Sequence, residues 1–315
     1  MNLTDYLKKF KPLHWIYNLT HLAGLKHNLN PYKKYGINKP LFGSVSSKDF
    51  PDKTSRAWLD INDSLHAVNS KKEFVSFPPE IQYQLKNWST NGYLILSGYF
   101  SERETDAINT EVDSLINKKG HAVTHDNKLM YGYKYSEAIK KMMHNSGLVK
   151  ILSFILDKEV VPFQTLNFVK GSGQRAHSDS IHMTTYPLGY LIAAWIALED
   201  IEPDSGPLFY YPGSHKLPYL LNDDFENYST QFMLGNKKYT DYEDVTEDIL
   251  KKSDFEKKIF LPKKGDVLIW HANLIHGGMP VANGALSRKS MVVHYYAKDV
   301  IKYHEITERP SLMEN

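Results

Sequence analysis

The stretch YLIAAWIALEDIEPDSGPLFYYPGSH, residues 190–215, decides how the fold is interpreted. It holds two apolar runs, residues 190–198 and 208–211, and turn signals follow at residues 203–206 (Pro-Asp-Ser-Gly) and 212–214 (Pro-Gly-Ser). Short apolar runs bounded by Gly, Pro, Asp and Ser are typical of buried strands joined by tight turns. The first run falls well short of the roughly 18 apolar residues that a membrane-spanning helix needs. We therefore interpret it as a buried strand.

The same rhythm continues through the C-terminal half of the chain, with further turn signals at residues 171–173, 264–266 and 283–284. Strands are predicted over residues 161–169, 183–186, 190–198, 208–211, 258–261, 266–270 and 289–296. This series indicates an antiparallel architecture and is best matched by a double-sheet jelly roll. The predicted fold class is mainly β with flanking helices, a cupin-like double-stranded β-helix.

Helices are predicted before these strands. Ser101 and Glu104 have the spacing of a capping box, and Ile108, Val112 and Leu115 follow at helical intervals. Other helices are expected over residues 80–88, 136–144 and 148–156, and a short strand over residues 93–96.

These patterns divide the chain into an N-terminal extension, residues 1–75, and a jelly-roll domain, residues 76–315, with an insertion at residues 216–257. The insertion is too long for an ordinary hairpin loop, so we expect a lid, a helical insertion or a mobile loop there. Together with residues 120–135 it is expected to set substrate specificity, because specificity usually resides in loops.

The N-terminal extension is basic and aromatic. Residues 1–40 carry seven lysines against the single acid Asp5. Such a segment can lie on anionic lipid, but more often its apolar side chains pack on the neighbouring domain while the lysines stay solvated. We favour packing, and peripheral membrane contact is the alternative.

Composition excludes several classes of protein. The net charge of +2 over 315 residues is too small for the basic footprint of a nucleic-acid-binding domain, so no nucleic-acid partner is expected. The absence of cysteine excludes disulfides and thiolate metal ligands. Lys8, Lys9 and Lys11 interrupt any secretory signal early. A soluble, cytoplasmic protein that acts on a small molecule is expected.

His177 and Asp179 are the strongest candidates for a metal site. On a β-strand, residues two apart share a face, so both side chains could reach one metal ion. His276, from a later strand, would complete a two-His-one-carboxylate set, which is typical of non-heme Fe(II) oxygenases. His182 and His271 also lie near these residues, but we expect neither to be a ligand. An odd spacing sends His182 to the other strand face, and His271 is better suited to support another ligand.

The ordered motifs from residue 80 to residue 297 resemble the phytanoyl-CoA dioxygenase-like family of Fe(II)- and 2-oxoglutarate-dependent oxygenases. The resemblance rests on these segments: Asn91-Gly92-Tyr93, His177-Ser178-Asp179, Trp195-Ile196-Ala197-Leu198, Gly206-Pro207-Leu208, Pro212-Gly213-Ser214-His215, Gly265-Asp266, His276-Gly277-Gly278 and Arg288. It implies that His177, Asp179 and His276 hold Fe(II), and that O2 and 2-oxoglutarate are cosubstrates.

The resemblance also implies contacts to the cosubstrate. Arg288 would pair with the far carboxylate of 2-oxoglutarate, because a planar guanidinium can donate two parallel hydrogen bonds to a carboxylate. Trp195, sixteen residues after Asp179, would line the cosubstrate pocket. Gln164 and Asn167, on the preceding strand, are further candidates. The family often has a hydroxyl residue two positions after the distal histidine, where this chain has Gly278.

The implied reaction is hydroxylation of an aliphatic C–H bond of a small or medium-sized metabolite, with release of succinate and CO2. Related halogenases have a small residue in place of the metal-binding carboxylate, so Asp179 favours hydroxylation. Two alternatives remain open: a metal-dependent jelly-roll enzyme that does not use 2-oxoglutarate, and a catalytically silent binding module. The sequence does not identify the substrate.

Overall fold

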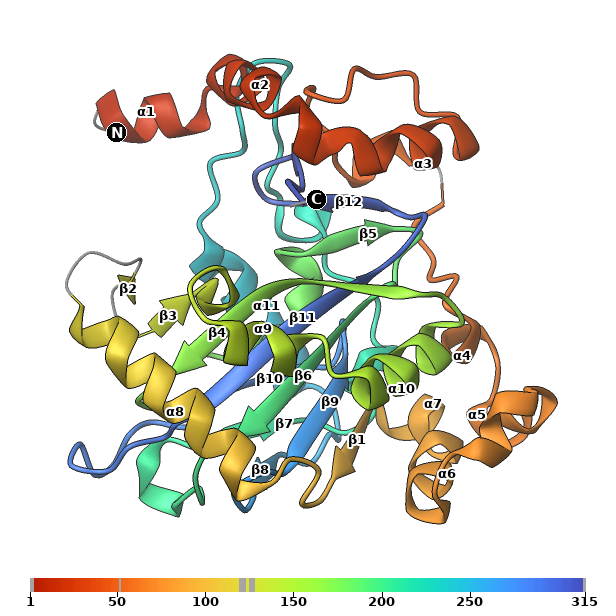
Figure 1. The fold of residues 1–315 in the computed structure, drawn as a ribbon. Coiled ribbons are helices and arrows are strands. Elements are labelled where there is room, and N and C mark those ends of the chain that lie inside the picture. The colour runs from red at the N-terminus through yellow and green to blue at the C-terminus, as the bar shows by residue number, and fades with distance from the viewer. Residues whose placement is uncertain (1–2, 51, 119–122, 125–127, 314–315) are drawn as a thin grey trace.

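The computed structural model describes residues 3–50, 52–118, 123–124 and 128–313. Its strands are β1 (Tyr93–Leu96), β2 (Val123–Thr124), β3 (Lys128–Met130), β4 (Val160–Phe168), β5 (Thr184–Tyr186), β6 (Leu191–Ala197), β7 (Leu208–Tyr210), β8 (Lys258–Phe260), β9 (Val267–His271), β10 (His276–Gly278), β11 (Ser290–Ala297), β12 (Ile301–His304) and β13 (Arg309–Pro310). A 7-stranded antiparallel sheet has the order β1-β9-β6-β11-β4-β3-β2 (Figure 1). Two 3-stranded sheets, β10-β7-β8 and β13-β12-β5, accompany it. The predicted jelly roll is confirmed.

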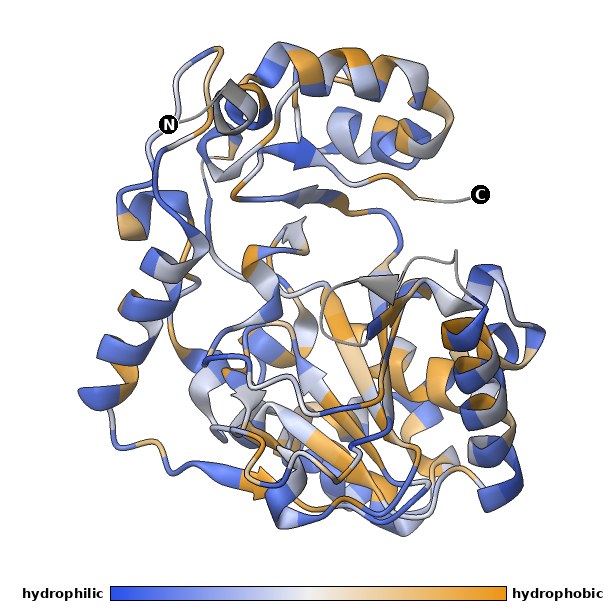
Figure 2. Cartoon of the chain, turned by 90° about the vertical axis from the view of Figure 1, so that its left-hand side faces the viewer, coloured by the Kyte–Doolittle hydropathy of each residue, from blue (hydrophilic) through white to orange (hydrophobic). Residues whose placement is uncertain are grey.

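Strand β6 shows why its sequence is apolar throughout. Ile192, Ala194 and Ile196 pack in one cluster with the helices, while Ala193 and Trp195 pack in a second cluster with β7 and β8. A strand covered on both faces carries a continuous apolar run instead of an alternating one. The apolar centre and the mixed faces of the surrounding helices are visible in Figure 2.

Helices cover the outer face of the large sheet. The described α-helices are α1 (Leu3–Lys9), α2 (Lys11–Thr20), α3 (Leu29–Lys34), α4 (Trp58–Ile61), α5 (Ser64–Ala67), α6 (Pro79–Lys86), α7 (Trp88–Asn91), α8 (Glu102–Asn117), α9 (Glu137–Met143), α10 (Ser146–Leu156) and α11 (Tyr239–Lys251). The predicted capping box begins α8, where Ser101 N donates to Glu104 at 2.9 Å. Helices α8, α9 and α10 lie across the sheet (Figure 1), and their apolar side chains form one core cluster with β6 and β11.

The insertion at residues 216–257 contains the 3-10 helix η9 (Asn222–Phe225) and the helix α11, joined by irregular chain. Its helix α11 is tied to the loop that carries His177: Arg175 forms ion pairs with Glu247 at 2.8 Å and Asp244 at 2.7 Å. The backbone N–H of Ser178 donates to the Tyr242 hydroxyl at 3.0 Å. The insertion therefore supports the candidate metal loop from outside.

The N-terminal helices pack over the C-terminal strands (Figure 1). Lys11 Nζ forms a buried ion pair with Glu308 at 2.5 Å, and the N–H of Met313 donates to the carbonyl of Gly24 at 2.9 Å. These contacts are the ones that the packing interpretation expects. Several apolar side chains of this segment nevertheless stay exposed: Tyr6, Leu7, Leu13, Ile16, Tyr17, Leu19, Leu22 and Leu29.

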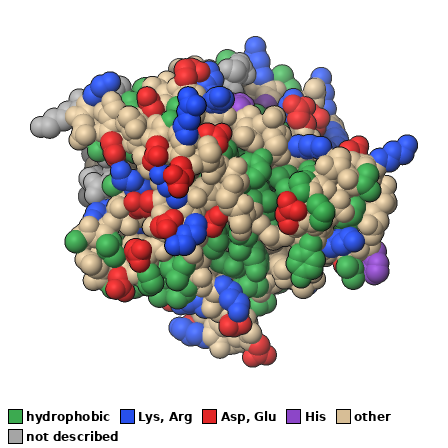
Figure 3. Space-filling view, turned by 60° about the horizontal axis from the view of Figure 1, so that its bottom comes forward, with side chains coloured by type: hydrophobic (Ala, Val, Ile, Leu, Met, Phe, Trp, Pro, Cys, Tyr) green, Lys and Arg blue, Asp and Glu red, His purple; other side chains and the backbone are tan. Residues whose placement is uncertain are grey.

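Within the described part of the chain, no helix combines the length and the apolar character that a membrane crossing requires. On the face drawn in Figure 3, acidic and basic side chains are interspersed around an apolar area.

The loop at residues 120–135, which was expected to set specificity, is described only in part. Residues 120–122 and 125–127 lie outside the described residues, while β3 and the 3-10 helix η5 (Gly132–Lys134) occupy its second half.

Candidate metal centre and cosubstrate pocket

His177, Asp179 and His276 come together as the sequence predicts, but not by the predicted route. Each offers a donor atom, and these atoms lie within 4.8 Å of one another. The prediction of a strand over residues 177–179 is wrong. His177 forms an isolated antiparallel bridge with His276. Asp179 begins the 3-10 helix η6 (Asp179–Ile181). The bridge brings the two imidazoles together, and the turn after it brings the carboxylate to the same point.

Backbone carbonyls orient both imidazoles. His177 Nδ1 lies 2.8 Å from the carbonyl oxygen of Arg175, and His276 Nδ1 lies 2.9 Å from that of Leu274. If each Nδ1–H donates to its carbonyl, each Nε2 keeps its lone pair for a metal ion. His276 Nε2 stands 3.7 Å from Asp179 Oδ1, in keeping with a shared centre.

The Asp179 carboxylate is also held in place. Trp270 Nε1 donates to its Oδ2 at 2.7 Å, and His294 Nε2 lies 3.5 Å from the same oxygen. Burial raises the pKa of Asp179, but the electrostatic interaction with His276 and the hydrogen bond and electrostatic interaction with His294 outweigh burial and hold the pKa below its usual range. Burial lowers the pKa of His177 to about 4. A neutral imidazole beside an ionised carboxylate is the protonation state that binds a metal cation.

His182 and His271 stay outside this group, as expected. His182 Nδ1 lies 3.4 Å from His304 Nε2, and His271 Nε2 lies 3.0 Å from Asp60 Oδ2. Among the described residues, the metal-binding group contains only His177, Asp179 and His276.

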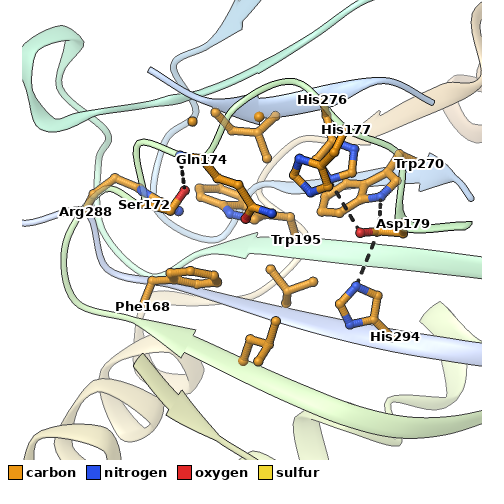
Figure 4. A pocket seen from close by; sticks show the side chains of 15 residues that line it. Phe168, Ser172, Gln174, His177, Asp179, Trp195, Trp270, His276, Arg288 and His294 are labelled. Carbon is orange, nitrogen blue, oxygen red and sulfur yellow. Dashed lines mark hydrogen bonds and ion pairs between the residues drawn. The ribbon is translucent and has the colours of Figure 1, made fainter. Parts of the chain in front are cut away.

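Arg288 lies in a small inner pocket of ≈ 70 Å³, at the end opposite the metal donors (Figure 4). Its side chain is buried, Nη1 donates to Ser290 Oγ at 2.9 Å, and Nε has no hydrogen-bond partner. No carboxylate among the described residues forms an ion pair with it. Burial lowers the pKa of Arg288 to about 10, which leaves it charged at neutral pH. A buried cation with unused donors fits a carboxylate ligand.

The predicted aromatic wall is present. Trp195 lines the inner pocket, and the guanidinium carbon of Arg288 lies 5.8 Å from its ring and 4.9 Å from that of Phe168. In Figure 4, Trp195 lies between Arg288 and the metal donors, and Phe168 lies below Arg288. An apolar wall lowers the local dielectric constant, which strengthens the attraction between the guanidinium and an anionic ligand in the pocket.

Gln164 and Asn167 lie elsewhere than predicted. Gln164 lines a larger outer cleft instead of the pocket with Arg288. Asn167 is buried on the opposite face of β4, where a Cβ on Gly132 would lie 3.1 Å from its Oδ1. Residues 166 and 168 line the inner pocket, so strand alternation turns residue 167 away. The structure therefore does not support Asn167 as a cosubstrate contact.

Ser172 occupies the space that a side chain at position 278 would need. A Cβ on Gly278 would lie 2.6 Å from Ser172 Oγ and 3.0 Å from Gly173 N. Ser172 also lines the inner pocket at the end where Arg288 lies (Figure 4). A hydroxyl from another loop therefore lies close to position 278, where the sequence has none.

The outer cleft has a volume of ≈ 520 Å³ and shares five lining residues with the inner pocket: Leu166, Gln174, His177, Asp179 and His294. Two of these are metal donors, so the donor group stands between the two cavities. This arrangement can hold a small anionic cosubstrate on one side and a larger molecule on the other.

Sequence reasoning overlooked Trp270, His294 and Ser172. Trp270 has the appearance of a core residue in an apolar strand. His294 could have been found from the predicted strand that follows Arg288. Residues two apart on a strand share a face, so residues 292 and 294 lie on the face of that strand that lines the inner pocket together with Arg288. Ser172 had no local signal, since its role depends on a close approach to Gly278 from a distant part of the chain.

A jelly roll with a buried two-His-one-Asp donor set, and with a buried arginine at the other end of the same pocket, is typical of a non-heme, metal-dependent oxygenase. The phytanoyl-CoA dioxygenase (PhyH) family profile matches residues 88–290, and the chain belongs to this family. Family and donor set identify Fe(II) and 2-oxoglutarate as the cofactors, with O2 as cosubstrate. The resemblance drawn from the sequence is confirmed.

Individual proteins agree with this assignment. A phytanoyl-CoA dioxygenase domain-containing protein 1 of Danio rerio is 26% identical over 215 residues, which cover 64% of this chain and 67% of that protein. The non-heme alpha ketoglutarate dependent carbocyclase SnoK has a TM-score of 0.61 at 15% identity, covering 77% of this chain and 95% of that chain. EctD from S. alaskensis, solved with 2-oxoglutarate and 5-hydroxyectoine, has a TM-score of 0.57 at 18% identity, covering 81% and 86%. The two structures show a shared fold.

Proposed function

We propose that this oxygenase hydroxylates an aliphatic C–H bond of a small or medium-sized metabolite. The observation that carries the proposal is the placement of the donor group between a small pocket ending in Arg288 and a larger open cleft. The stoichiometry would be substrate, O2 and 2-oxoglutarate in, and hydroxylated substrate, succinate and CO2 out. A cytoplasmic location stays a prediction from the sequence.

Each side chain has a defined task in this proposal. His177, Asp179 and His276 would hold Fe(II), which when bound supplies the O2-dependent oxidation coupled to decarboxylation of 2-oxoglutarate. Arg288 would bind the far carboxylate of the cosubstrate. Ser172 would donate a hydrogen bond to that carboxylate, in place of the hydroxyl missing at Gly278.

The surrounding residues hold this arrangement and keep water out. Trp270 fixes the Asp179 carboxylate through its Nε1–H, which leaves Oδ1 directed toward His276. Phe168 and Trp195 line the pocket with apolar surface, which strengthens the pairing of Arg288 with an anion. Fixing donors before the ligands arrive lowers the reorganisation that binding and reaction require.

Hydroxylation is favoured over halogenation because the Asp179 carboxylate is present and is itself one of the three metal donors. Other oxidative outcomes share the fold, as the carbocyclase SnoK illustrates. Product analysis with a converted substrate distinguishes them, because hydroxylation alone adds one oxygen atom from O2 to the product.

The test is an anaerobic titration of metal-free protein with Fe(II) and 2-oxoglutarate, followed through the visible absorption band of their complex. The wild type, His177→Ala and Arg288→Gln are compared, with Arg103→Gln as matched control because Arg103 is exposed on α8. We expect the band in the wild type and the control, and its loss in His177→Ala. Arg288→Gln should need about tenfold or more 2-oxoglutarate, the effect of losing a charge-assisted hydrogen bond.

Three results would redirect the assignment. Stoichiometric iron binding without the band would favour a metal-dependent enzyme that does not use 2-oxoglutarate. Absence of iron binding would favour a silent binding module. Unchanged 2-oxoglutarate affinity in Arg288→Gln would remove Arg288 from the site.

A further inference from the structure

Two of the five arginines line cavities without a carboxylate partner. Arg56 and Arg175 form ion pairs with acids, and Arg103 is exposed on α8. Arg288 lines the inner pocket, and Arg309 lines the outer cleft. Among the described residues, no Asp or Glu forms an ion pair with either. Because Arg288 is assigned to a carboxylate of the cosubstrate, we ask which anion Arg309 binds in the outer cleft.

Arg309 is held at the cleft by packing. It stands opposite His304 in the β12–β13 pairing, so both side chains lie on the same face. The guanidinium carbon of Arg309 lies 5.0 Å from the ring centre of Tyr17 in the N-terminal segment. The guanidinium is thus oriented by an aromatic ring and a neighbouring strand while its hydrogen-bond donors remain available.

The acids nearest in sequence to Arg309 are already engaged. Glu308 is paired with Lys11 at 2.5 Å. Glu305 accepts hydrogen bonds from Ser47 Oγ at 2.6 Å and from Asn222 N at 3.1 Å. Among the residues that the structure describes, Asp179 is the only acid that lines the outer cleft, and it belongs to the metal-binding group. The described lining of the cleft therefore has one cation without an ion-pair partner and no spare carboxylate to neutralise it.

The rest of the cleft is of mixed character. On its wall, His304 Nδ1 accepts a hydrogen bond from the Thr307 N–H at 3.3 Å, and His304 Nε2 lies 3.4 Å from His182 Nδ1. His182 Nε2 is then the ring nitrogen that can offer an N–H donor. Apolar surface comes from Phe163, Met183, Tyr296, Pro310 and Leu312. A ligand that matches this cleft has an anionic group at one end and an apolar part.

We propose that Arg309, with His304 beside it, binds the anionic group of the primary substrate, a carboxylate or phosphate attached to an apolar chain or ring. Its apolar part lies along Phe163 and Met183, which brings C–H bonds toward His177 and Asp179. This proposal rests on the proposed function, because it names the substrate class of that same site. It also gives the N-terminal segment a part in substrate binding, since Tyr17 positions Arg309.

The test compares three probes of equal chain length: octanoate, octyl phosphate and octan-1-ol. Their dissociation constants are measured by isothermal titration calorimetry on full-length protein, both metal-free and loaded anaerobically with Fe(II) and 2-oxoglutarate. The variants are Arg309→Gln, Arg309→Lys and the exposed control Arg103→Gln. Thermal unfolding of each variant reports whether its fold is kept.

We expect an anionic probe to bind about tenfold or more tightly than octan-1-ol, because the alcohol cannot form the charge-assisted pair. Arg309→Gln should remove this preference, Arg309→Lys should keep part of it, and Arg103→Gln should leave it unchanged. The relative affinities of octanoate and octyl phosphate then identify which anion the site prefers.

Three outcomes would overturn the proposal: equal affinity for the acid and the alcohol, a preference that persists in Arg309→Gln, or no binding of either anion. Failure of the proposed function is recognised separately, by the absence of the Fe(II)–2-oxoglutarate band. Anion binding by the metal-free protein is measured independently of that band.

Discussion

Ser172→Ala tests whether a hydroxyl from a distant loop replaces the one missing at Gly278. A Cβ built on Gly278 would lie 2.6 Å from Ser172 Oγ. Ser172 also lines the inner pocket at the end where Arg288 lies. A hydrogen bond to a charged group is worth about 1.5–3 kcal/mol. Since about 1.4 kcal/mol corresponds to tenfold in affinity, the dissociation constant for 2-oxoglutarate should rise about 10- to 100-fold.

The assay is the anaerobic titration with Fe(II), in which the iron affinity of Ser172→Ala should stay unchanged because Ser172 lies away from the metal donors. Ser70→Ala, at an exposed serine, is the control. Gly278→Ser alone should weaken binding, because its Cβ would press on Ser172 and on the backbone of Gly173. The double variant Ser172→Ala/Gly278→Ser relieves the closest contact and should recover part of the affinity. A dissociation constant within about twofold of wild type in Ser172→Ala would refute this reasoning.

Three further changes have defined outcomes. Trp270→Phe removes the 2.7 Å hydrogen bond to Asp179 and should lower Fe(II) affinity about tenfold or more, measured by competition with a chelator. Lys302→Met should stabilise the protein: burial lowers the pKa of Lys302 from 10.5 to about 8, which corresponds to about 3 kcal/mol at pH 7, measured by urea unfolding. The folded state binds fewer protons than the unfolded state between those pKa values, so this gain should disappear as the pH rises from 8 to 10.5. Lys11→Met leaves the Glu308 carboxylate buried without its partner and should cost about 3–5 kcal/mol of unfolding free energy.

Each of these predictions has a result that contradicts it. Unchanged iron affinity in Trp270→Phe would mean that Asp179 needs no support from the indole. A stability gain in Lys302→Met that persists at pH 10.5 would indicate better packing in place of relieved desolvation. Equal unfolding free energies for Lys11→Met and wild type would show that Glu308 is solvated when its partner is absent, and the double variant with Glu308→Gln measures the coupling directly.

Patterns of local origin were predictable. The capping box at Ser101 and Glu104, the helix that follows it and the apolar strand at residues 191–197 all depend on residues close in sequence. Strands β12 and β13 were not predicted: both are short, β12 pairs with β5, which lies far away in the chain, and β13 pairs with β12. The N-terminal helices were expected to pack on the domain, but nothing local indicated that they pack against the C-terminal strands.

The candidate site divides in the same way. The donor residues His177, Asp179 and His276 were recognisable because their chemical types and order suit a metal ion, even though the expected strand through the first two is absent. Asn167 was predicted to contact the cosubstrate but is turned away from the inner pocket, because its orientation depends on which face of β4 meets the second sheet.

By itself, the sequence determined the donor chemistry, the family and the jelly-roll architecture, because these follow from residue types and from short repeated patterns. Only the tertiary structure decided which side chains meet across long separations. The approach of Ser172 to Gly278, the indole support of Asp179 and the pairing that leaves Arg309 without a carboxylate all depend on strand register and loop packing. Such contacts result from the simultaneous packing of many segments, so no local pattern contains them.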